Sequence, residues 1–158
     1  MSLNRPIPTV CEVNEYVHPT SVVCTACPTG STSAGGTPSM CTCNAGTGRV
    51  NKSDVTLPCL ACPGPPEAPT LDSNIPPNVD LSWSPPSASG GWSYTYEVSW
   101  TNGSVIVPRQ AGTTGQIPGL QAETEYTVEI TAYPESTLCP EQATTFMFMT
   151  TQSKQNLQ

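Results

Sequence analysis

Apolar and polar residues alternate with a period of two in the second half of the chain. In one such segment, Val79, Leu81 and Trp83 alternate with Asp80 and Ser82. This period predicts a strand that buries one face and leaves the other in water. The segments with the pattern span residues 79–84, 95–100 and 126–132, and turn-forming residues gather at 85–91, 102–103 and 112–115. About seven short strands over about 90 residues predict an antiparallel β-sandwich.

The first 62 residues lack any such period and are rich in Ser, Thr, Gly, Pro and Cys. Tyr16 is their only aromatic residue, and the other nine aromatic residues of the chain follow them. Domains this small seldom bury enough apolar surface to be stable without cross-links. Turn sequences at residues 28–31 and 34–37 predict irregular loops with one or two short hairpins and no helix. We therefore expect a small, disulfide-rich module ahead of the sandwich.

A proline-rich stretch at residues 63–69 separates the two compositions. Such a stretch is stiff and extended, so it fixes domain spacing better than a Gly/Ser linker does. The expected fold class is mostly β, with a small disulfide-rich irregular module followed by an antiparallel sandwich. The expected parts are a cysteine-rich module at residues 4–62, the junction at 63–69, the sandwich at 66–152 and a tail at 153–158.

The net charge of the chain limits the classes of partner that it can bind. The chain has a net charge of −7 and only five Lys and Arg residues. Nucleic acids and anionic lipids are bound by clustered cations, so we expect neither nucleic-acid binding nor membrane contact by this segment. No run of about 20 apolar residues is present. The polar, proline-rich beginning at Met1 does not resemble a secretory leader, which leads us to expect a piece of a larger protein.

The density of cysteine in the first segment is typical of proteins from oxidising compartments. Two N-x-S sequences, at Asn51 and Asn102, are candidate glycosylation sites of a glycoprotein. We therefore expect the extracellular side of the plasma membrane as the location, with secretion as the alternative.

The cysteines can be interpreted either as ligands of a zinc site or as partners in disulfides. Cys24-x-x-Cys27 and Cys59-x-x-Cys62 have the local spacing of a four-thiolate zinc site. The gap between the two pairs exceeds the usual 15–20 residues, at about 31, and contains two further cysteines. An even count favours disulfides, but eight cysteines allow 105 pairings. The candidate disulfide residues are Cys11, Cys24, Cys27, Cys41, Cys43, Cys59, Cys62 and Cys139.

We find no pattern of catalytic, cofactor-binding or metal-ligating residues. His18 is the only histidine and lies in a loop sequence, where we expect it to face solvent. A Cys–His nucleophile needs a free thiol, and every cysteine has a candidate partner. The carboxylates of Glu123, Glu125 and Glu129 are typical of a solvated strand face rather than a metal site. The segment is therefore expected to be non-catalytic, with no cofactor.

One candidate contact surface stands out near the end of the chain. The segment Phe146, Met147, Phe148 and Met149 is apolar at consecutive positions, so that one face of its strand is core and the other carries two bulky apolar side chains. A neighbouring strand or domain would cover the second face, or a following module or a partner chain would dock on it. Trp92, in a predicted loop, is a weaker candidate of the same kind.

The second half resembles a fibronectin type III domain over residues 66 to about 152. In that family the tryptophan of the second strand is a core residue, and a leucine and a tyrosine lock the loop before the sixth strand. The resemblance assigns these structural roles to Trp83, Leu120 and Tyr126. It rests on Glu67-Ala68-Pro69, on L-x-W-x-P-P (Leu81, Trp83, Pro85, Pro86), on Tyr96-x-Val98, and on Ile117, Gly119, Leu120, Thr124 and Tyr126.

The first half resembles the cysteine-rich, ephrin-receptor-type or EGF-like repeat that precedes the first fibronectin domain of Eph receptor tyrosine kinases. Module order and the short proline-rich join also match. The chain departs from the pattern at Thr47-Gly48, which replaces an aromatic pair, and in the additional Cys62 and Cys139. The matching residues are Cys27, Pro28, Ser31, Ser33, Gly36, Cys41, Cys43, Gly46, Arg49, Asp54, Pro58 and Cys59.

The resemblance implies the bridges Cys27–Cys41 and Cys43–Cys59, which leave Cys11–Cys24 and Cys62–Cys139. In the sandwich fold, Cys62 and the loop carrying Cys139 belong to the same pole, and a bridge there would pin the two modules together.

The implied function is that of a non-catalytic extracellular spacer and interaction segment of a cell-surface receptor. The parent would be a single-pass receptor tyrosine kinase with its kinase beyond Gln158, and the partners would be adjacent ectodomain modules or a second receptor copy. The alternative is an adhesion or extracellular-matrix protein without a kinase. A third hypothesis is a spacer in a secreted hydrolase.

Overall fold

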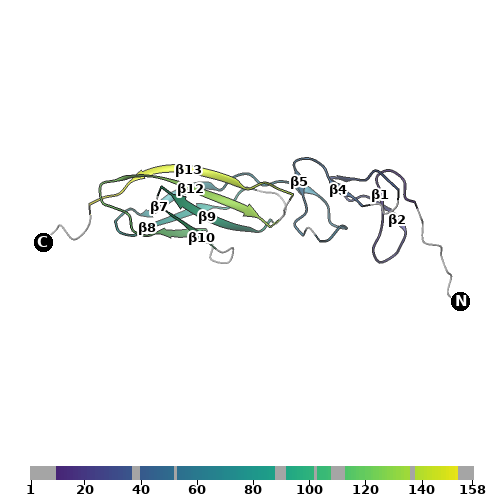
Figure 1. The fold of residues 1–158 in the computed structure, drawn as a ribbon, viewed down its shortest axis with the longest axis horizontal. Helices are drawn as coiled ribbons and strands as arrows, with labels where there is room; N and C mark the ends of the chain where they lie inside the picture. The colour runs from purple at the N-terminus through teal and green to yellow at the C-terminus, as the bar shows by residue number, and fades with distance from the viewer. Residues whose placement is uncertain are drawn as a thin grey trace. The chain divides into compact units, whose positions relative to one another are not determined.

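The computed structural model describes residues 10–36, 40–51, 53–87, 92–101, 103–107, 113–135 and 138–152. All regular structure in these ranges is β-strand, in agreement with the predicted mostly-β class (Figure 1). The chain forms two units. The first comprises residues 1–62 with Ser136–Cys139, and the second comprises Pro63–Glu135 with Pro140–Gln158.

The first unit consists of loops joined by three antiparallel two-stranded sheets, one more than the one or two hairpins expected. Tyr16 is buried at 3% exposure, and so are the cysteines Cys11, Cys41 and Cys59. Disulfides and a single aromatic ring therefore make up most of the interior. The sheets pair β1 (Glu15–Val17) with β2 (Cys24–Ala26), β3 (Ser31–Thr32) with β4 (Thr42–Cys43), and β5 (Thr47–Gly48) with β6 (Leu60–Ala61).

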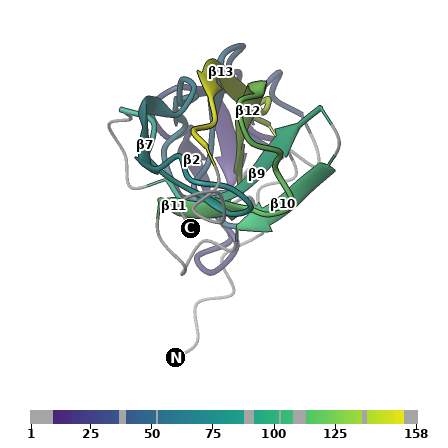
Figure 2. The same cartoon turned by 90° about the vertical axis from the view of Figure 1, so that its left-hand side faces the viewer.

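The second unit is formed by two antiparallel sheets, with strand orders β11-β8-β7 and β10-β9-β12-β13. In Figure 2 the strands β12, β9 and β10 follow one another along one side of this unit. The strands are β7 (Glu67–Ser73), β8 (Val79–Ser84), β9 (Tyr94–Trp100), β10 (Gly103–Val107), β11 (Thr114–Ile117), β12 (Glu125–Pro134) and β13 (Gln142–Met149).

Alternation in the sequence becomes alternation of burial. In β8 the residues Val79, Leu81 and Trp83 are at most 4% exposed, and Val98 of β9 and Val128 of β12 are fully buried. These side chains from both sheets form the core of the sandwich.

Two strands begin inside segments for which the sequence indicated other structure. The strand β7 starts at Glu67, within the expected junction, and β11 starts at Thr114, within the expected turn cluster at 112–115. In the second case Gly115 pairs with Leu81 of β8. Glycine favours turns, but here the pairing partner decides the local conformation.

Candidate functional site

Four disulfides connect consecutive cysteines. The pairs are Cys11–Cys24, Cys27–Cys41, Cys43–Cys59 and Cys62–Cys139. No free cysteine remains, so the thiolates that a zinc site would need are all consumed. These are the pairs that the resemblance implied. The first three close loops of 13 to 16 residues, whereas the fourth spans 77 residues.

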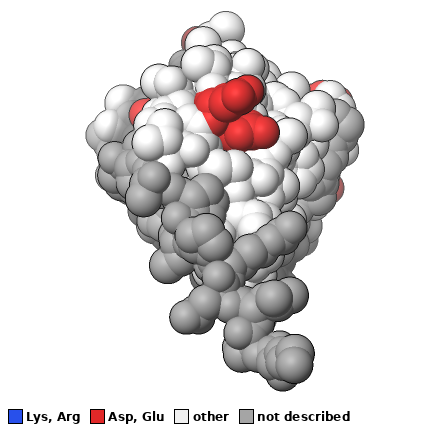
Figure 3. All heavy atoms as spheres, turned by 90° about the vertical axis from the view of Figure 1, so that its right-hand side faces the viewer, with Lys and Arg blue, Asp and Glu red and all other residues white. Residues whose placement is uncertain are grey.

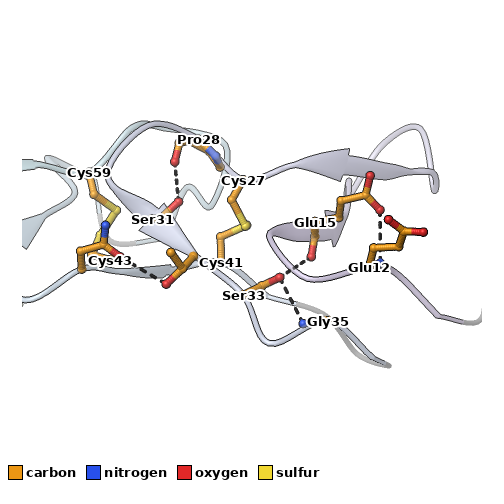
Figure 4. The surroundings of a disulfide bond; sticks show 12 residues. Glu12, Glu15, Cys27, Pro28, Ser31, Ser33, Gly35, Cys41, Cys43 and Cys59 are labelled. Atoms are coloured by element: carbon orange, nitrogen blue, oxygen red, sulfur yellow. Dashed lines mark hydrogen bonds between the residues drawn. A yellow bond between two sulfur atoms is a disulfide. The ribbon is translucent and has the colours of Figure 1, made fainter.

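Hydrogen bonds from small polar side chains fix the loops around Cys27–Cys41 (Figure 4). The Ser33 hydroxyl donates to the Glu15 carbonyl oxygen at 2.6 Å and accepts from the Gly35 amide at 3.4 Å. The Ser31 hydroxyl donates to the Pro28 carbonyl oxygen at 2.7 Å. Serine is abundant here because its short side chain satisfies backbone groups that no regular sheet pairs.

Gly30 is required by a close approach of two backbone segments. Its φ is 78°, and a Cβ atom at this position would collide with the carbonyl oxygen of Cys59. The Cys59 amide donates to the Thr29 carbonyl oxygen at 2.8 Å, which holds the segments together. Gly46 has a similar φ of 76°, but its Cβ would meet open space. Of these two glycines, Gly30 alone is therefore fixed by packing as well as by backbone conformation.

Arg49 is the only cation among the described residues, and it is buried at 4% exposure. Its Nε donates to the Leu57 carbonyl oxygen at 3.1 Å, and its Nη2 donates to the Cys41 carbonyl oxygen at 3.0 Å. The guanidinium thus bridges two loops of the first unit. The described surface consequently carries no exposed cation, and Figure 3 shows carboxylates but no Lys or Arg on the described part of one face.

Asp54 organises the neighbouring turn. Its carboxylate accepts hydrogen bonds from the hydroxyl and the amide of Thr56, at 2.6 and 2.9 Å. These bonds favour the charged form and lower the pKa of the Asp54 carboxyl below its ordinary value, with a smaller contribution from Arg49.

The residues that the resemblance singled out in the sandwich are fold residues. Trp83 is buried and meets the ring of Tyr96 edge-on at 5.4 Å. The Tyr126 hydroxyl accepts a hydrogen bond from the Gln121 amide at 3.0 Å, and the Leu120 amide donates to the Pro77 carbonyl oxygen at 3.0 Å. These contacts lock the loop before β12.

Two buried tyrosines of β9 lie beside this core. The hydroxyl of Tyr94 is buried without a hydrogen-bond partner among the described residues, and burial raises the pKa of this group. Burial, together with Tyr94, raises the pKa of Tyr96 to about 12. Both phenols therefore stay protonated at neutral pH.

The outer strand β13 presents the predicted apolar segment. Phe148 is 8% exposed and its ring lies 5.8 Å from that of Phe146, on the inner side of the strand. Met147 and Met149 point the other way, with 68% and 62% of their surface exposed. Trp92 differs from the prediction. It is only 8% exposed, so its indole does not offer an exposed contact surface.

The two sequons differ in what the structure shows of them. Asn51 is exposed, and its side-chain oxygen accepts from the Ser53 amide at 3.0 Å. Asn102 lies outside the described residues. His18 is partly buried rather than fully exposed, because its Nδ1 lies 3.1 Å from the Thr20 hydroxyl and Tyr16 packs near its ring.

Neither a metal-binding cluster nor a catalytic arrangement occurs in the described part of the chain. No helix long and apolar enough to cross a membrane is found there either. A shallow recess of about 230 Å³ in the second unit has polar walls and is continuous with the locked loop. It is lined by Thr101, Gly119, Gln121, Thr124, Glu125 and Tyr126.

The comparisons with known proteins agree with this geometry. The family profile "Fibronectin type III domain" matches residues 64–147. Ephrin type-A receptor 4-B of Xenopus laevis is 31% identical over 144 residues, which cover 77% of this chain and 14% of the receptor. Ephrin type-A receptor 4-A of the same species is 31% identical over 142 residues, which cover 76% of this chain and 14% of that receptor. The chain therefore spans about a seventh of the length of these relatives.

Solved structures also resemble the sandwich. The fn3 domain of human collagen alpha-1(XX) chain is 28% identical with a TM-score of 0.46, covering 57% of this chain and 87% of that one. The central fibronectin-III array of RIM-binding protein is 20% identical with a TM-score of 0.45, and the match covers 56% of this chain and 35% of that one.

Together, the two antiparallel sheets and the family match confirm the predicted fold class. The locked loop around Tyr126 has the predicted geometry as well. The chain belongs to the fibronectin type III family.

Proposed function

We propose that this chain is a non-catalytic spacer and interaction segment in the ectodomain of a cell-surface receptor of the Eph receptor tyrosine kinase type. The observation that carries the proposal is the succession of a disulfide-linked module and a fibronectin type III sandwich, in a chain 31% identical to two ephrin type-A receptors. An adhesion or matrix protein without a kinase is the second candidate. The additional bridge Cys62–Cys139, which departs from the Eph-type pattern, favours it.

Disulfides support the extracellular placement. All eight cysteines are paired, and such pairs persist in oxidising compartments. The first unit also depends on them, since its described interior consists mainly of cystine and one tyrosine. In a reducing cytosol this unit would lose its cross-links and unfold.

Covalent connectivity supports the spacer role. Residues 136–139 of the β12–β13 loop belong to the first unit, and Cys139 is bonded to Cys62. The chain therefore passes between the units at residue 62 and again on both sides of this loop. We propose that these connections, in place of a single linker, are what suits the segment to a spacer role.

Two experiments test the proposal. The coding sequence beyond Gln158 should encode a span of about 20 apolar residues followed by a Gly-rich loop, H-R-D and D-F-G. An apolar span without kinase motifs, or further repeats alone, would instead support the adhesion protein. Antibodies against this segment should also label intact, unpermeabilised cells or the medium. Labelling only after permeabilisation would refute the extracellular placement.

Small-angle X-ray scattering tests the spacer role. The Cys62→Ser/Cys139→Ser variant, measured beside the parent chain in enough sodium sulfate to keep its tryptophan fluorescence native, should show a broader distribution of interatomic distances than the parent. Its matched control, Cys11→Ser/Cys24→Ser, removes a bridge within the first unit and should not broaden the distribution. Identical distributions for the parent and the Cys62/Cys139 variant would contradict the role of this bridge.

A further inference from the structure

The outward face of the four-stranded sheet combines exposed apolar and acidic side chains. On β13, Met147 and Met149 are more than 60% exposed, and on β12 the side chains of Glu125 and Glu129 are exposed as well. Glu97 of the neighbouring β9 is partly exposed and accepts a hydrogen bond from a tyrosine hydroxyl of β12 at 2.9 Å. We call these five residues the outer sheet face.

Strand register brings the two kinds of side chain together. Met149 lies opposite Glu125, and Met147 lies opposite Thr127, between Glu125 and Glu129. Side chains directly opposite in an antiparallel pair have Cβ atoms about 5 Å apart, and diagonal ones about 7–8 Å. A ligand that contacts the thioether of either methionine can therefore also reach a carboxylate.

No described cation neutralises these carboxylates. Arg49, the single described cation, is buried in the first unit. In the full sequence the second unit holds nine of the twelve Asp and Glu residues and two of the five Lys and Arg residues. The whole net charge of −7 therefore resides in the unit that carries the outer sheet face.

This negative charge indicates which kind of partner suits the outer sheet face. A second copy of the chain would bring two sandwiches of the same negative charge together, and like charges placed close together repel. A purely apolar partner would strip water from the carboxylates without pairing them, which is costly. A partner with cations around an apolar centre pairs the carboxylates and covers the methionines. Methionine adapts its shape readily and is frequent at such surfaces.

We propose that the outer sheet face binds a partner protein segment that presents apolar side chains flanked by Lys or Arg. The proposal deepens the interaction role stated above and rests on it.

The test uses the whole chain with methyl-labelled methionine and a synthetic peptide in which Lys alternates with Leu and Val. The chain has only four methionines, so their NMR methyl signals are readily resolved. The signals of Met147 and Met149 should move on titration. Met40 is 64% exposed in the first unit and serves as the internal control, which should not move. The shift should shrink as salt rises, because exposed ion pairs are screened.

Variants separate the two contributions. The double substitution Glu125→Gln/Glu129→Gln should weaken peptide binding about three-fold to ten-fold, since each exposed ion pair contributes a factor of a few. The double substitution Met147→Thr/Met149→Thr should weaken it as well, and threonine suits an exposed strand position. A peptide with Glu in place of Lys should not bind. Tryptophan fluorescence during urea unfolding checks that each variant remains folded.

Three results would overturn the proposal. The first is an equal shift of Met40, which would mean unspecific adsorption. The second is binding that is indifferent to the Glu→Gln pair. The third is a concentration-dependent dimer in sedimentation without peptide that the Met→Thr pair abolishes, which would make a second copy the occupant. Each result concerns only this partner class, whereas failure of the extracellular receptor role would appear in the surface labelling.

Discussion

Replacing both Cys62 and Cys139 with Ser should strongly destabilise the second unit. The bridge closes a loop of 77 residues that contains every strand of the sandwich from β7 to β12. A cross-link stabilises mainly by restricting the unfolded chain, and the restriction grows with the logarithm of loop length. For a loop of this length the chain-entropy relation gives about 4.5 kcal/mol at 25 °C. That is a large fraction of the about 5–15 kcal/mol by which domains are stable.

Tryptophan fluorescence during urea unfolding measures this loss selectively. All three tryptophans, Trp83, Trp92 and Trp100, belong to the second unit, so the signal does not depend on the first. The variant should show a much lower midpoint, and its free energy should depend somewhat more steeply on urea, because its unfolded chain is no longer held together by the bridge. If it is unfolded in water, sodium sulfate stabilises the folded state, and the parent is then measured in the same salt.

The matched control removes Cys11–Cys24, which closes a loop of 13 residues in the first unit. This variant should leave the tryptophan-reported unfolding unchanged. A loss below about 1 kcal/mol for the Cys62/Cys139 variant would refute the entropic reasoning. An equal loss in the control would show that the two units unfold as one.

Further predictions concern single side chains. Tyr126→Phe should lower the free energy of unfolding by about 1 kcal/mol, because a backbone amide loses its acceptor. Tyr94→Phe should raise it by up to about 1 kcal/mol, because this change removes a buried hydroxyl that has no described partner, and the reverse order of the two variants in urea unfolding would contradict both assignments. Gly30→Ala should abolish the four-disulfide species in intact mass spectra, because the added Cβ atom would collide with the Cys59 carbonyl oxygen. Gly46→Ala should cost only about 1 kcal/mol of backbone strain. Equal yields of the four-disulfide species from the two variants would argue against the close approach of Gly30 to Cys59. The pKa of Tyr96 is raised from 10.0 to about 12, so the unfolded chain loses this proton first. Stability from this group should be complete below pH 10 and decline as the pH rises towards 12, and a flat urea midpoint over that range would contradict it.

Several features of the sandwich followed directly from the sequence. Val79, Leu81 and Trp83 alternate with polar residues. In a half-buried strand this alternation places all three apolar side chains on the buried face. The apolar segment of β13 was predicted to carry two outward side chains, and Met147 and Met149 are highly exposed. Family resemblance, rather than spacing, pointed to the pairs of cysteines that the structure bonds.

Other features had no local signal. The burial of Arg49 depends on two carbonyl groups, one eight residues before it and one eight residues after it. Trp92 has the sequence context of an exposed loop, yet only 8% of its surface is exposed. Thr114 and Gly115 favour a turn, yet they form a strand because β8 offers unpaired backbone groups.

Period-two alternation and cysteine density already specify the class of each unit, because both are local properties of composition and order. Which carboxylates lie beside Met147 and Met149 depends on how the strands pair. Strand register is set by pairing between segments about 20 residues apart, and a shift of one residue would turn every side chain to the other face. The acidic and apolar outer sheet face is therefore a property of the folded sheet, although each of its residues is visible in the chain.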